Sequence, residues 1–357
     1  MDVAIIGASG YGGGELLRLL AMHPHARLVA ATSNTYAGHK ASEVFPGLSH
    51  RLDLEFIPED EVNALTAVPI VFLARDNGYA MHAAPKLLER GCRIIDLSAD
   101  FRFRDPQIYP QWYRLEHTAP HLLPEAVYGI PEIHRSAIRS ARLVGNPGCY
   151  ATASILALAP LLARRAPDAP HGFVPDPVID PATVIIDAKS GVSGAGRAKP
   201  ALEYRFAEAN EAVSAYKIAG THRHTPEIEA QLSHLVGRAM TVSFTPHLIP
   251  MTRGILATCY ANLTAPISEQ DLRERIRAFY AGEPFVVVMD GLPSTKHALG
   301  SNLCLIGVGV DRRTERVTVV SALDNLVKGM AGQAVQNMNL MCGFEEDAGL
   351  RLPGMWP

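Results

Sequence analysis

Cysteine is scarce in this chain, and its distribution argues against two classes of protein. Only five of the 357 residues are cysteine, and they are scattered without a C-x-x-C pair. A disulfide-stapled secreted domain needs an even, clustered set of cysteines, and a zinc ribbon needs them in close pairs. We therefore expect reduced thiols and a cytoplasmic protein.

An excess of one charge and long apolar runs are missing as well. The 33 Lys and Arg residues nearly balance the 36 Asp and Glu residues, which gives no bias toward nucleic acid or an anionic membrane. Proline, glycine or charge interrupts every apolar run before the ~20 residues that span a bilayer. The N-terminus passes from Asp2 straight into a strand pattern, so we expect no secretory signal. We expect a small-molecule partner, with neither nucleic acid nor membrane bound.

The N-terminal pattern is typical of a dinucleotide site. A short apolar run, Val3 to Ile6, leads into the glycine-rich residues 7–14, and a helical pattern follows from Glu15. Glycines let backbone amides approach a pyrophosphate, and a helix N-terminus adds partial positive charge. The spacing is G-x-x-G-x-x-G, and a simple tight turn is the alternative. The predicted cofactor contacts here are Gly7, Ser9, Gly10, Tyr11, Gly12 and Gly13.

The second strand pattern, Leu28 to Ala31, ends in Thr32, Ser33 and Asn34. An NAD site usually carries Asp or Glu at this position to hold the ribose 2′-hydroxyl. Neutral hydroxyls on Thr32 and Ser33 suit a 2′-phosphate better, which favours NADP(H). No basic residue follows directly, although His39 and Lys40 are near enough in sequence to contribute.

Alternating strand and helix patterns continue toward residue 144 and predict a mostly parallel sheet with right-handed crossovers. Residues 101–131 break this alternation, and we expect a long irregular excursion over the sheet. The proline-rich residues 166–182 predict a surface loop. Beyond them, extended patterns predict an α+β domain with a largely antiparallel sheet, at 184–188, 240–244, 254–261, 285–289 and a hairpin of 304–310 with 316–321. Helices are predicted at 226–235, from Ser268, and at 325–341, the last packing back on the first domain.

Cys149 occupies a position that favours a nucleophile. A strand pattern at 141–144 precedes it, a helix-forming run at 153–159 follows it, and Pro147 and Gly148 bend the chain between them. Cys149 should therefore lie in the first turn of a helix, where unpaired N–H groups and the helix dipole stabilise a thiolate. The alternative is a buried cysteine that acts as a small apolar side chain.

Two later segments are richer in glycine and polar residues than packing requires. Residues 190–197 could wrap a phosphate or form a flexible loop. At 221–227, Thr225 and Pro226 predict a helix N-cap and first helical position, preceded by His222 and His224. Histidine is the usual proton shuttle near neutral pH, whereas the alternatives are a capping or core histidine, or half of a metal site that lacks a suitably spaced third ligand. Arg102 and Arg253 are candidate anion contacts or surface residues.

Nine motifs, taken together and in order, resemble one family, the N-acetyl-γ-glutamyl-phosphate reductases of arginine biosynthesis. They span nearly the whole chain: GASGYGG at 7–13, DLSADFR at 96–102, YGIPE at 128–132, GNPGCYAT at 145–152, SGVSGAGR at 190–197, GTHRHTPEI at 220–228, RGIL at 253–256, GSN at 300–302 and DNLVKGMAGQA at 324–334. No single motif identifies the family, but the ordered set is highly specific.

The resemblance implies a fold, an assembly and an activity. The fold is α/β, with a Rossmann-type NADP-binding domain (1–148, completed by 324–357) and a glyceraldehyde-3-phosphate dehydrogenase-like catalytic and oligomerisation domain (149–323). The assembly is a homo-oligomer, either a dimer or a tetramer. The activity is a phosphorylating aldehyde dehydrogenase run in reverse, in which NADPH reduces a small-molecule acyl phosphate, N-acetyl-L-glutamyl 5-phosphate, to the 5-semialdehyde and phosphate is released.

The family motifs also assign residues. The nucleophile falls on Cys149, and the catalytic histidine falls within HRH, with His222 as the first choice and His224 as the second. Arg102 is implied to meet the substrate. We further assign Asn146 and Arg253 to the substrate, and Ser190, Gly191 and Asn325 to the cofactor.

This chain departs from the family pattern at two places. Two other functions are also alternatives to the reductase activity. Residues 73–78 read LARDNG where the family commonly has a Leu-Pro-His-Gly turn, and Asn34 stands where many members are basic. A lysine-pathway reductase of aminoadipyl or glutamyl phosphate on an acidic carrier protein would use the same chemistry. A dinucleotide-binding regulator that has lost catalysis is the alternative from another class.

Overall fold

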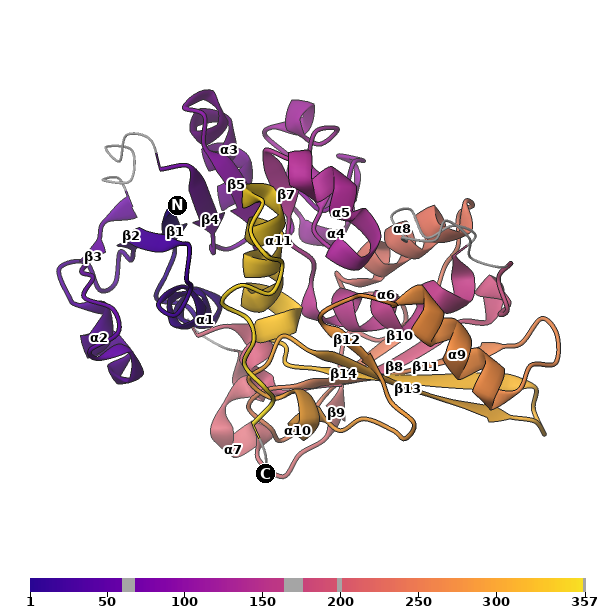
Figure 1. Cartoon of the computed structure of the whole chain (residues 1–357). Helices are drawn as coiled ribbons and strands as arrows, with labels where there is room; N and C mark the ends of the chain where they lie inside the picture. Colours follow the sequence, from indigo (N-terminus) through magenta and orange to yellow (C-terminus); the bar gives the residue numbers. More distant parts are fainter. Residues whose placement is uncertain (60–67, 164–175, 198–200, 356–357) are drawn as a thin grey trace. The chain divides into compact units, whose positions relative to one another are not determined.

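The computed structural model describes residues 1–59, 68–163, 176–197 and 201–355 (Figure 1). The chain divides into two compact units. The first contains Met1–Pro147, Gly196–Lys199 and Met330–Arg351, and the second contains Gly148–Ala195, Pro200–Gly329 and Leu352–Pro357. Within the described ranges, every helix is too short or too polar to cross a bilayer. Residues 166–175 of the proline-rich loop predicted at 166–182 lie outside the described residues.

The first unit is built on a parallel sheet of seven strands in the order β3-β2-β1-β4-β5-β7-β6. The interior strands are almost continuously apolar and buried, as expected for a sheet covered on both faces. The strand order reverses between β1 and β4, and such reversals are where open α/β sheets bind ligands. The strands are β1 (Asp2–Ile6), β2 (Arg27–Thr32), β3 (Phe56–Ile57), β4 (Ile70–Leu73), β5 (Arg93–Asp96), β6 (Val127–Tyr128) and β7 (Leu143–Gly145).

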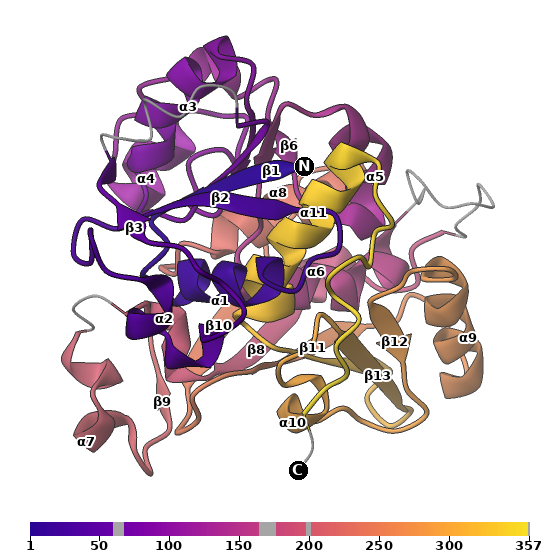
Figure 2. The same cartoon turned by 60° about the vertical axis from the view of Figure 1, so that its left-hand side comes forward.

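Helices cover this sheet. Figure 2 shows α11 (Gly332–Cys342) running between α1 (Tyr11–Leu20) and α5 (Pro131–Ser140), and it contacts both. The predicted C-terminal helix is interrupted, because a π-helical turn at Val327–Ala331 precedes α11. Helix α3 (Tyr79–Glu89) packs on β5.

Residues 101–131 are more regular than expected. They contain the short helix α4 (Ile108–Tyr113) and the edge strand β6. Phe101, Phe103 and Tyr109 are buried in the same apolar core as α3. The segment is therefore a packed part of the first unit, because its aromatic side chains bury apolar area in the core. Its prolines had suggested an irregular loop instead.

The second unit is built on a mixed sheet in the order β12-β13-β14-β11-β8-β10-β9. Four of the pairings are antiparallel, whereas β8 with β10 and β12 with β13 are parallel. The predicted hairpin is confirmed as β13 and β14. The strands are β8 (Ile185–Ser190), β9 (Ser214–Ala215), β10 (Ser243–Leu248), β11 (Ile255–Asn262), β12 (Val286–Val288), β13 (Cys304–Asp311) and β14 (Arg316–Leu323).

Strand β10 begins and ends later than predicted. It runs through Pro246, whose carbonyl accepts a hydrogen bond from the backbone N–H of Tyr216 at 3.1 Å. Only the short strand β9 lies beyond β10 in the sheet. Proline is tolerated near a sheet edge because a missing N–H there breaks little of the ladder.

Helix α6 (Cys149–Leu162) is buried around nearly its whole circumference, as expected for an all-apolar core helix. It packs on β11 and β14 and between α8 (Thr225–Val236) and α9 (Glu269–Phe279) (Figure 1). Along β11, residues alternate between buried and half-buried, so one sheet face lies under α6 and the other is partly exposed. Two short helices, α7 (Phe206–Ala209) and α10 (Thr295–Ala298), complete the unit, and α2 (Ala41–Val44) belongs to the first.

Candidate active site

The glycine loop after β1 is a tight turn. Gly7 has φ +88°, a left-handed conformation that favours glycine, and a Cβ there would lie 2.5 Å from the carbonyl oxygen of Ala74. The backbone N–H of Gly7 donates to Oγ1 of Thr32 at 3.0 Å, and that of Ala8 donates to the carbonyl of Thr32 at 2.8 Å. The end of β2 therefore holds the turn in place.

Two further glycines, Gly13 and Gly10, have different roles in the predicted dinucleotide site. A Cβ on Gly13 would lie 2.5 Å from the carbonyl oxygen of Gly7, so this glycine permits close packing of α1 on the turn. A Cβ on Gly10 would meet no described atom within 4 Å. Gly10 is also the N-cap of α1, and no described side chain caps that helix start. Open space, uncapped N–H groups and the helix dipole together fit a pyrophosphate.

Hydroxyl groups gather beside this loop. Ser33 donates to Oγ of Ser9 at 2.8 Å and accepts a hydrogen bond from the backbone N–H of Tyr36 at 3.1 Å. The two basic residues that were expected to contribute to the 2′-phosphate site, His39 and Lys40, lie next to acidic side chains instead. His39 lies 3.3 Å from Glu43 and Lys40 lies 2.9 Å from Asp53, and all four side chains are exposed.

In the second unit, Cys149 is the first residue of α6, as predicted. Gly148 is the N-cap residue and has no side chain of its own to cap the helix. Cys149 is partly exposed, whereas Cys92, Cys259 and Cys304 are buried. Burial raises the pKa of Cys92 and raises that of Cys259 to about 12, so those thiols stay protonated. Cys149 combines access with a helix N-terminus, as a nucleophile requires.

A buried carboxylate lies directly before Cys149. Oε1 of Glu227 accepts a hydrogen bond from the backbone N–H of Gly148 at 2.7 Å, and Glu227 is only 1% exposed. Glu227 also lies in the first turn of α8. Its carboxylate therefore lies at the N-terminal ends of both α6 and α8, where the helix dipole favours a negative group. Sequence reasoning did not single out Glu227, although its place in the first turn of the predicted helix was a usable signal.

His222 is held in one protonation state. Its Nδ1 accepts the backbone N–H of His224 at 3.0 Å, and ring edges of Tyr150, Tyr216 and Phe244 surround the imidazole at centroid distances of 5.6, 5.5 and 5.3 Å. Burial, assisted by the neighbouring His224, lowers the pKa of His222 to about 2. The ring is therefore neutral near pH 7, and because Nδ1 accepts, we infer that its proton lies on Nε2.

His224 occupies the N-cap position of α8. We predicted Thr225 and Pro226 as N-cap and first helical residue, but the helix begins one residue earlier, because His224 already has helical backbone angles. Its ring lies edge-on to that of Tyr150 at 5.9 Å and to that of His222 at 4.9 Å. The structure thus brings both predicted histidines against the residue that follows Cys149.

Two tyrosines link the histidine segment to the sheet. The hydroxyl of Tyr216 donates to that of Tyr150 at 3.2 Å, and the Tyr150 hydroxyl donates to the carbonyl of His247 at 3.3 Å. Burial raises the pKa of both phenols, so they remain neutral. Neither was predicted from the sequence, and for Tyr216 we find no local signal.

The predicted cofactor contacts of the second half form one compact turn. Asn325 accepts the backbone N–H of Gly254 at 2.7 Å and donates to Oγ of Ser193 at 2.9 Å. Ser190 donates to the carbonyl of Gly191 at 2.9 Å, and a Cβ on Gly191 would lie 2.7 Å from the carbonyl of Thr252. These polar groups therefore shape the backbone of the second unit at this turn.

The predicted substrate contacts differ in what they touch. In the second unit, Arg253 lies 3.6 Å from the buried carboxylate of Asp324. In the first unit, Arg102 donates to the carbonyls of Asn146 at 2.7 Å and Leu97 at 3.1 Å, joining the ends of β5 and β7. The amide of Asn146 is fully buried, donates to Met330 and accepts from Asn337.

The segment that departs from the family pattern is ordered by local contacts. Gly78 has φ +97°, and its N–H donates to the buried carboxylate of Asp100 at 2.8 Å. The Arg75 guanidinium pairs with Glu59 at 2.8 Å. Asn77 accepts the N–H of Ala99 at 3.0 Å.

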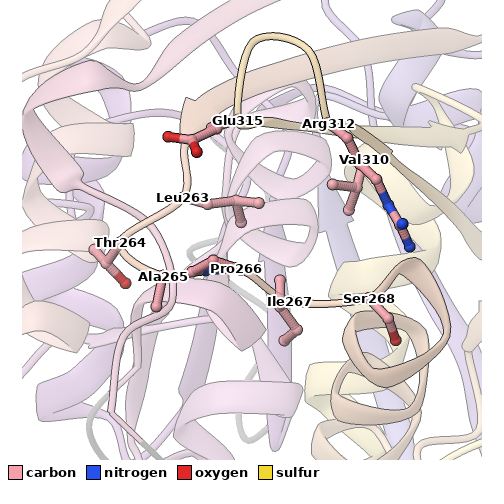
Figure 3. A pocket seen from close by; sticks show the side chains of 9 residues that line it. All are labelled: Leu263, Thr264, Ala265, Pro266, Ile267, Ser268, Val310, Arg312 and Glu315. Atoms are coloured by element: carbon pink, nitrogen blue, oxygen red, sulfur yellow. The ribbon is translucent and has the colours of Figure 1, made fainter.

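A separate hollow of about 450 Å³ lies in the second unit where the loop from Leu263 to Ser268 meets the β13–β14 hairpin. Figure 3 shows its apolar lining, with Arg312 and Glu315 at the rim. The residues predicted for the active site are not among its described lining residues.

Comparison with known proteins agrees with this geometry. Residues 2–141 match the family model of the semialdehyde dehydrogenase NAD binding domain, and residues 149–325 match that of the semialdehyde dehydrogenase dimerisation domain. The chain is 53% identical to an N-acetyl-gamma-glutamyl-phosphate reductase of Pelotomaculum thermopropionicum, covering 100% of this chain and 99% of that protein. It is 54% identical to the protein of the same name from Symbiobacterium thermophilum, covering 98% and 97%.

Solved structures extend the fold comparison. Aspartate semialdehyde dehydrogenase II from Vibrio cholerae aligns with a TM-score of 0.72 at 17% identity, over 96% of this chain and 98% of that one. The Candida albicans aspartate semialdehyde dehydrogenase, solved with NADP, aligns with a TM-score of 0.66 at 14% identity, over 96% and 98%. The predicted fold class, a dinucleotide-binding α/β domain with a second α+β domain, is confirmed.

Proposed function

Because the chain belongs to the N-acetyl-gamma-glutamyl-phosphate reductase family, we propose that it reduces N-acetyl-L-glutamyl 5-phosphate to the 5-semialdehyde and releases phosphate, in arginine biosynthesis. The observation that carries the proposal is Cys149, partly exposed at the start of α6 and followed by Tyr150, against which both histidine rings lie. A nucleophilic thiol beside imidazoles suits acyl transfer from a phosphate leaving group.

The first step needs an ionised sulfur. The Cys149 thiolate attacks the acyl carbon, a sulfur–carbon bond forms, and the carbon–oxygen bond breaks with its electron pair leaving on phosphate. The N–H of Gly148 is taken by Glu227, so donors to the developing oxyanion come from the next amides in the first turn of α6. Glu227 therefore fixes the bend in the chain directly before Cys149.

A proton must then be supplied to the reduced acyl group. A bound reduced nicotinamide would supply the hydride. The thiohemiacetal on Cys149 then collapses: the sulfur–carbon bond breaks with its electron pair returning to sulfur, and the aldehyde is released. We assign the proton to His224, with His222 as a positioning residue, which reverses the order expected from the sequence. The reason is that His222, with its pKa lowered to about 2, cannot take up a proton near neutral pH, while its Nδ1 fixes the backbone of His224.

The first unit fits a nicotinamide dinucleotide, and Gly7, Gly10 and Gly13 divide the roles that such a site requires. We propose that residues 1–148 with the C-terminal helix form an NADP-binding domain and that residues 149–323 form the catalytic domain. Ser9, Thr32 and Ser33 would hold the ribose side. Arg253 and Arg102 would meet anionic groups of the substrate, each bringing a planar guanidinium suited to carboxylate or phosphate.

We also propose a homo-oligomer, in which the partly exposed face of the second sheet meets a second copy. Along β11 every other residue is half-buried, which leaves one face of an eight-residue strand only partly covered within the chain. Light scattering during size-exclusion chromatography should give a mass of at least two chains. A monomer at micromolar concentration would contradict this assembly.

One assay separates the competing functions. NADPH oxidation should require free N-acetylglutamyl phosphate and should release one phosphate per NADPH consumed. Turnover only with an acyl phosphate attached to a carrier protein would favour the lysine-pathway reductase. Cofactor binding without turnover of either substrate would favour a regulator.

A further inference from the structure

We propose that Arg197 recognises the 2′-phosphate of the cofactor and sets the preference for NADPH over NADH. The inference rests on the proposed function only in assuming a nicotinamide dinucleotide at the glycine loop. Arg197 lies far along the chain from the glycine loop and the end of β2, where sequence reasoning looked for a basic residue. It belongs to the first unit, in the short segment Gly196–Lys199.

The Arg197 guanidinium lies against the glycine loop. Its Nη1 donates to the backbone carbonyl of Ser9 at 3.0 Å, and its Nη2 lies 3.5 Å from the hydroxyl of Tyr36. Its carbon Cζ is 5.4 Å from the centre of the Tyr36 ring and 5.1 Å from that of Phe45. Two aromatic rings and a carbonyl thus fix the plane of the cation, which lowers the entropy lost when it binds a phosphate.

The surroundings of Arg197 match a phosphate better than a ribose hydroxyl. The hydroxyls of Ser9 and Ser33 are hydrogen-bonded to each other at 2.8 Å beside the carbonyl that Arg197 contacts. This is the end of β2, where dinucleotide folds meet the ribose 2′ position. Hydroxyl donors next to a planar guanidinium are the groups that bind a dianionic phosphate with charge-assisted hydrogen bonds.

Arg197 does not share its charge with an acidic side chain in the described ranges. In the described part of the chain, no carboxylate pairs with Arg197. Glu59, whose backbone N–H donates to the side chain of Asn34, has its own carboxylate paired with Arg75 at 2.8 Å. The alternative cations, His39 and Lys40, are exposed and each lies next to an acidic side chain. Unlike Arg75, His39 and Lys40, Arg197 therefore has no acidic partner among the described residues, and its positive charge can meet a phosphate.

Binding of nucleotide fragments tests the proposal without turnover. Calorimetry should compare 2′,5′-ADP, which has the 2′-phosphate, with 5′-AMP, which lacks it. Arg197→Gln should weaken 2′,5′-ADP binding about tenfold to a hundredfold, the range expected for a lost charge-assisted bond, and leave 5′-AMP binding within about twofold. Arg27→Gln is the matched control, because it removes one cation from the opposite end of β2, where Arg27 pairs with Asp2, and should change neither affinity.

Kinetics give a second readout. In Arg197→Gln, kcat/KM for NADPH should fall in the same proportion, mainly through KM, while kcat/KM for NADH stays near the wild-type value. Unchanged 2′,5′-ADP affinity, or an equal loss for both fragments, would overturn the proposal, the second result assigning Arg197 a purely structural role. A wild-type chain that binds 2′,5′-ADP through Arg197 but reduces no acyl phosphate would overturn the proposed function and leave this inference standing.

Discussion

The carboxylate of Glu227 accepts a hydrogen bond from the backbone N–H of Gly148 at 2.7 Å, one residue before the cysteine that opens α6. This bond joins the first turn of α8 to the bend before α6. It satisfies a buried donor and aligns two helix starts on one charge. Glu227 therefore holds the bend directly before Cys149.

Removing this carboxylate should separate stability from catalysis. Glu227→Ala leaves the Gly148 N–H buried and unpaired, which should lower the free energy of unfolding by about 1–3 kcal/mol in urea titrations. Glu227→Gln keeps an acceptor and should lose less stability, but kcat should still fall because the bend is held less firmly. The control is Glu229→Ala on the same helix, whose carboxylate accepts the N–H of Val242. An unchanged kcat in both Glu227 variants would remove its positioning role.

Substitution of the proposed nucleophile should stop turnover. Cys149→Ser and Cys149→Ala should each lower kcat on the order of 10⁴-fold or more, because no thioester forms. NADPH binding, followed by fluorescence, should be retained, because the cofactor contacts that we propose lie in other residues. The matched control is Cys342→Ser, a partly buried thiol at the end of α11, which should keep activity. Retained turnover in the Cys149 variants would exclude the mechanism.

Replacing each of the two histidines should lower the rate to a different extent. The pKa of His222 is lowered to about 2, so its titration cannot shape the rate between pH 5 and 8. His224→Asn should lower kcat about 10²–10⁴-fold, because it removes the proposed proton donor. His222→Asn should lower kcat less than His224→Asn does, and it should leave the pH dependence of kcat between pH 5 and 8 unchanged. The opposite pattern would restore the order that the sequence suggested.

Neighbouring glycines of the cofactor loop should tolerate alanine unequally. Gly13→Ala places a Cβ 2.5 Å from the Gly7 carbonyl and 2.6 Å from Cα of Ala8, which should cost about 3 kcal/mol of stability. Gly10→Ala meets open space at φ −72° and should cost less than about 1 kcal/mol. It should nevertheless raise the KM for NADPH, because the new methyl group occupies the approach to the helix start. Equal melting temperatures for the two variants would contradict this division.

Asp96 should make the stability of the first unit depend on pH. Burial, together with the nearby Asp100, raises the pKa of the Asp96 carboxyl above its ordinary value of about 4. The folded state therefore binds more protons than the unfolded state above that value, so stability should fall as pH rises from about 4. Asp96→Asn should flatten this dependence in urea titrations at a series of pH values. A wild-type stability that rises over the same range would contradict the assignment.

Local chemistry explains which features could be predicted from the sequence. The helix start at Cys149 follows from a strand, a Pro-Gly bend and a helix-forming run. The start of α9 follows from Ser268, which accepts the N–H of Asp271 at 3.0 Å, and the end of α11 follows from Gly343 at φ +71°. Each of these signals lies within a few residues of the feature that it fixes.

Contacts between distant segments could not be predicted in the same way. His39 and Lys40 were near the end of β2 in sequence, but acidic neighbours pair with them, and Arg197 reaches Ser9 from another part of the chain. The bond from Gly148 to Glu227 depends on how α6 packs against α8. Such contacts depend on tertiary packing, which cannot be deduced from the local pattern of residues along the sequence.

The first unit is assembled from both ends of the chain. Helix α11, near the C-terminal end of the chain, contacts α1, α5 and β5, whereas the second unit draws mainly on residues between 148 and 329. During synthesis at the ribosome, the sheet that begins with Asp2 therefore waits for more than three hundred residues before its covering helix emerges. Until then the apolar surface that α11 covers stays exposed, so a nascent chain stalled short of Gly332 should be a target for chaperones and aggregation.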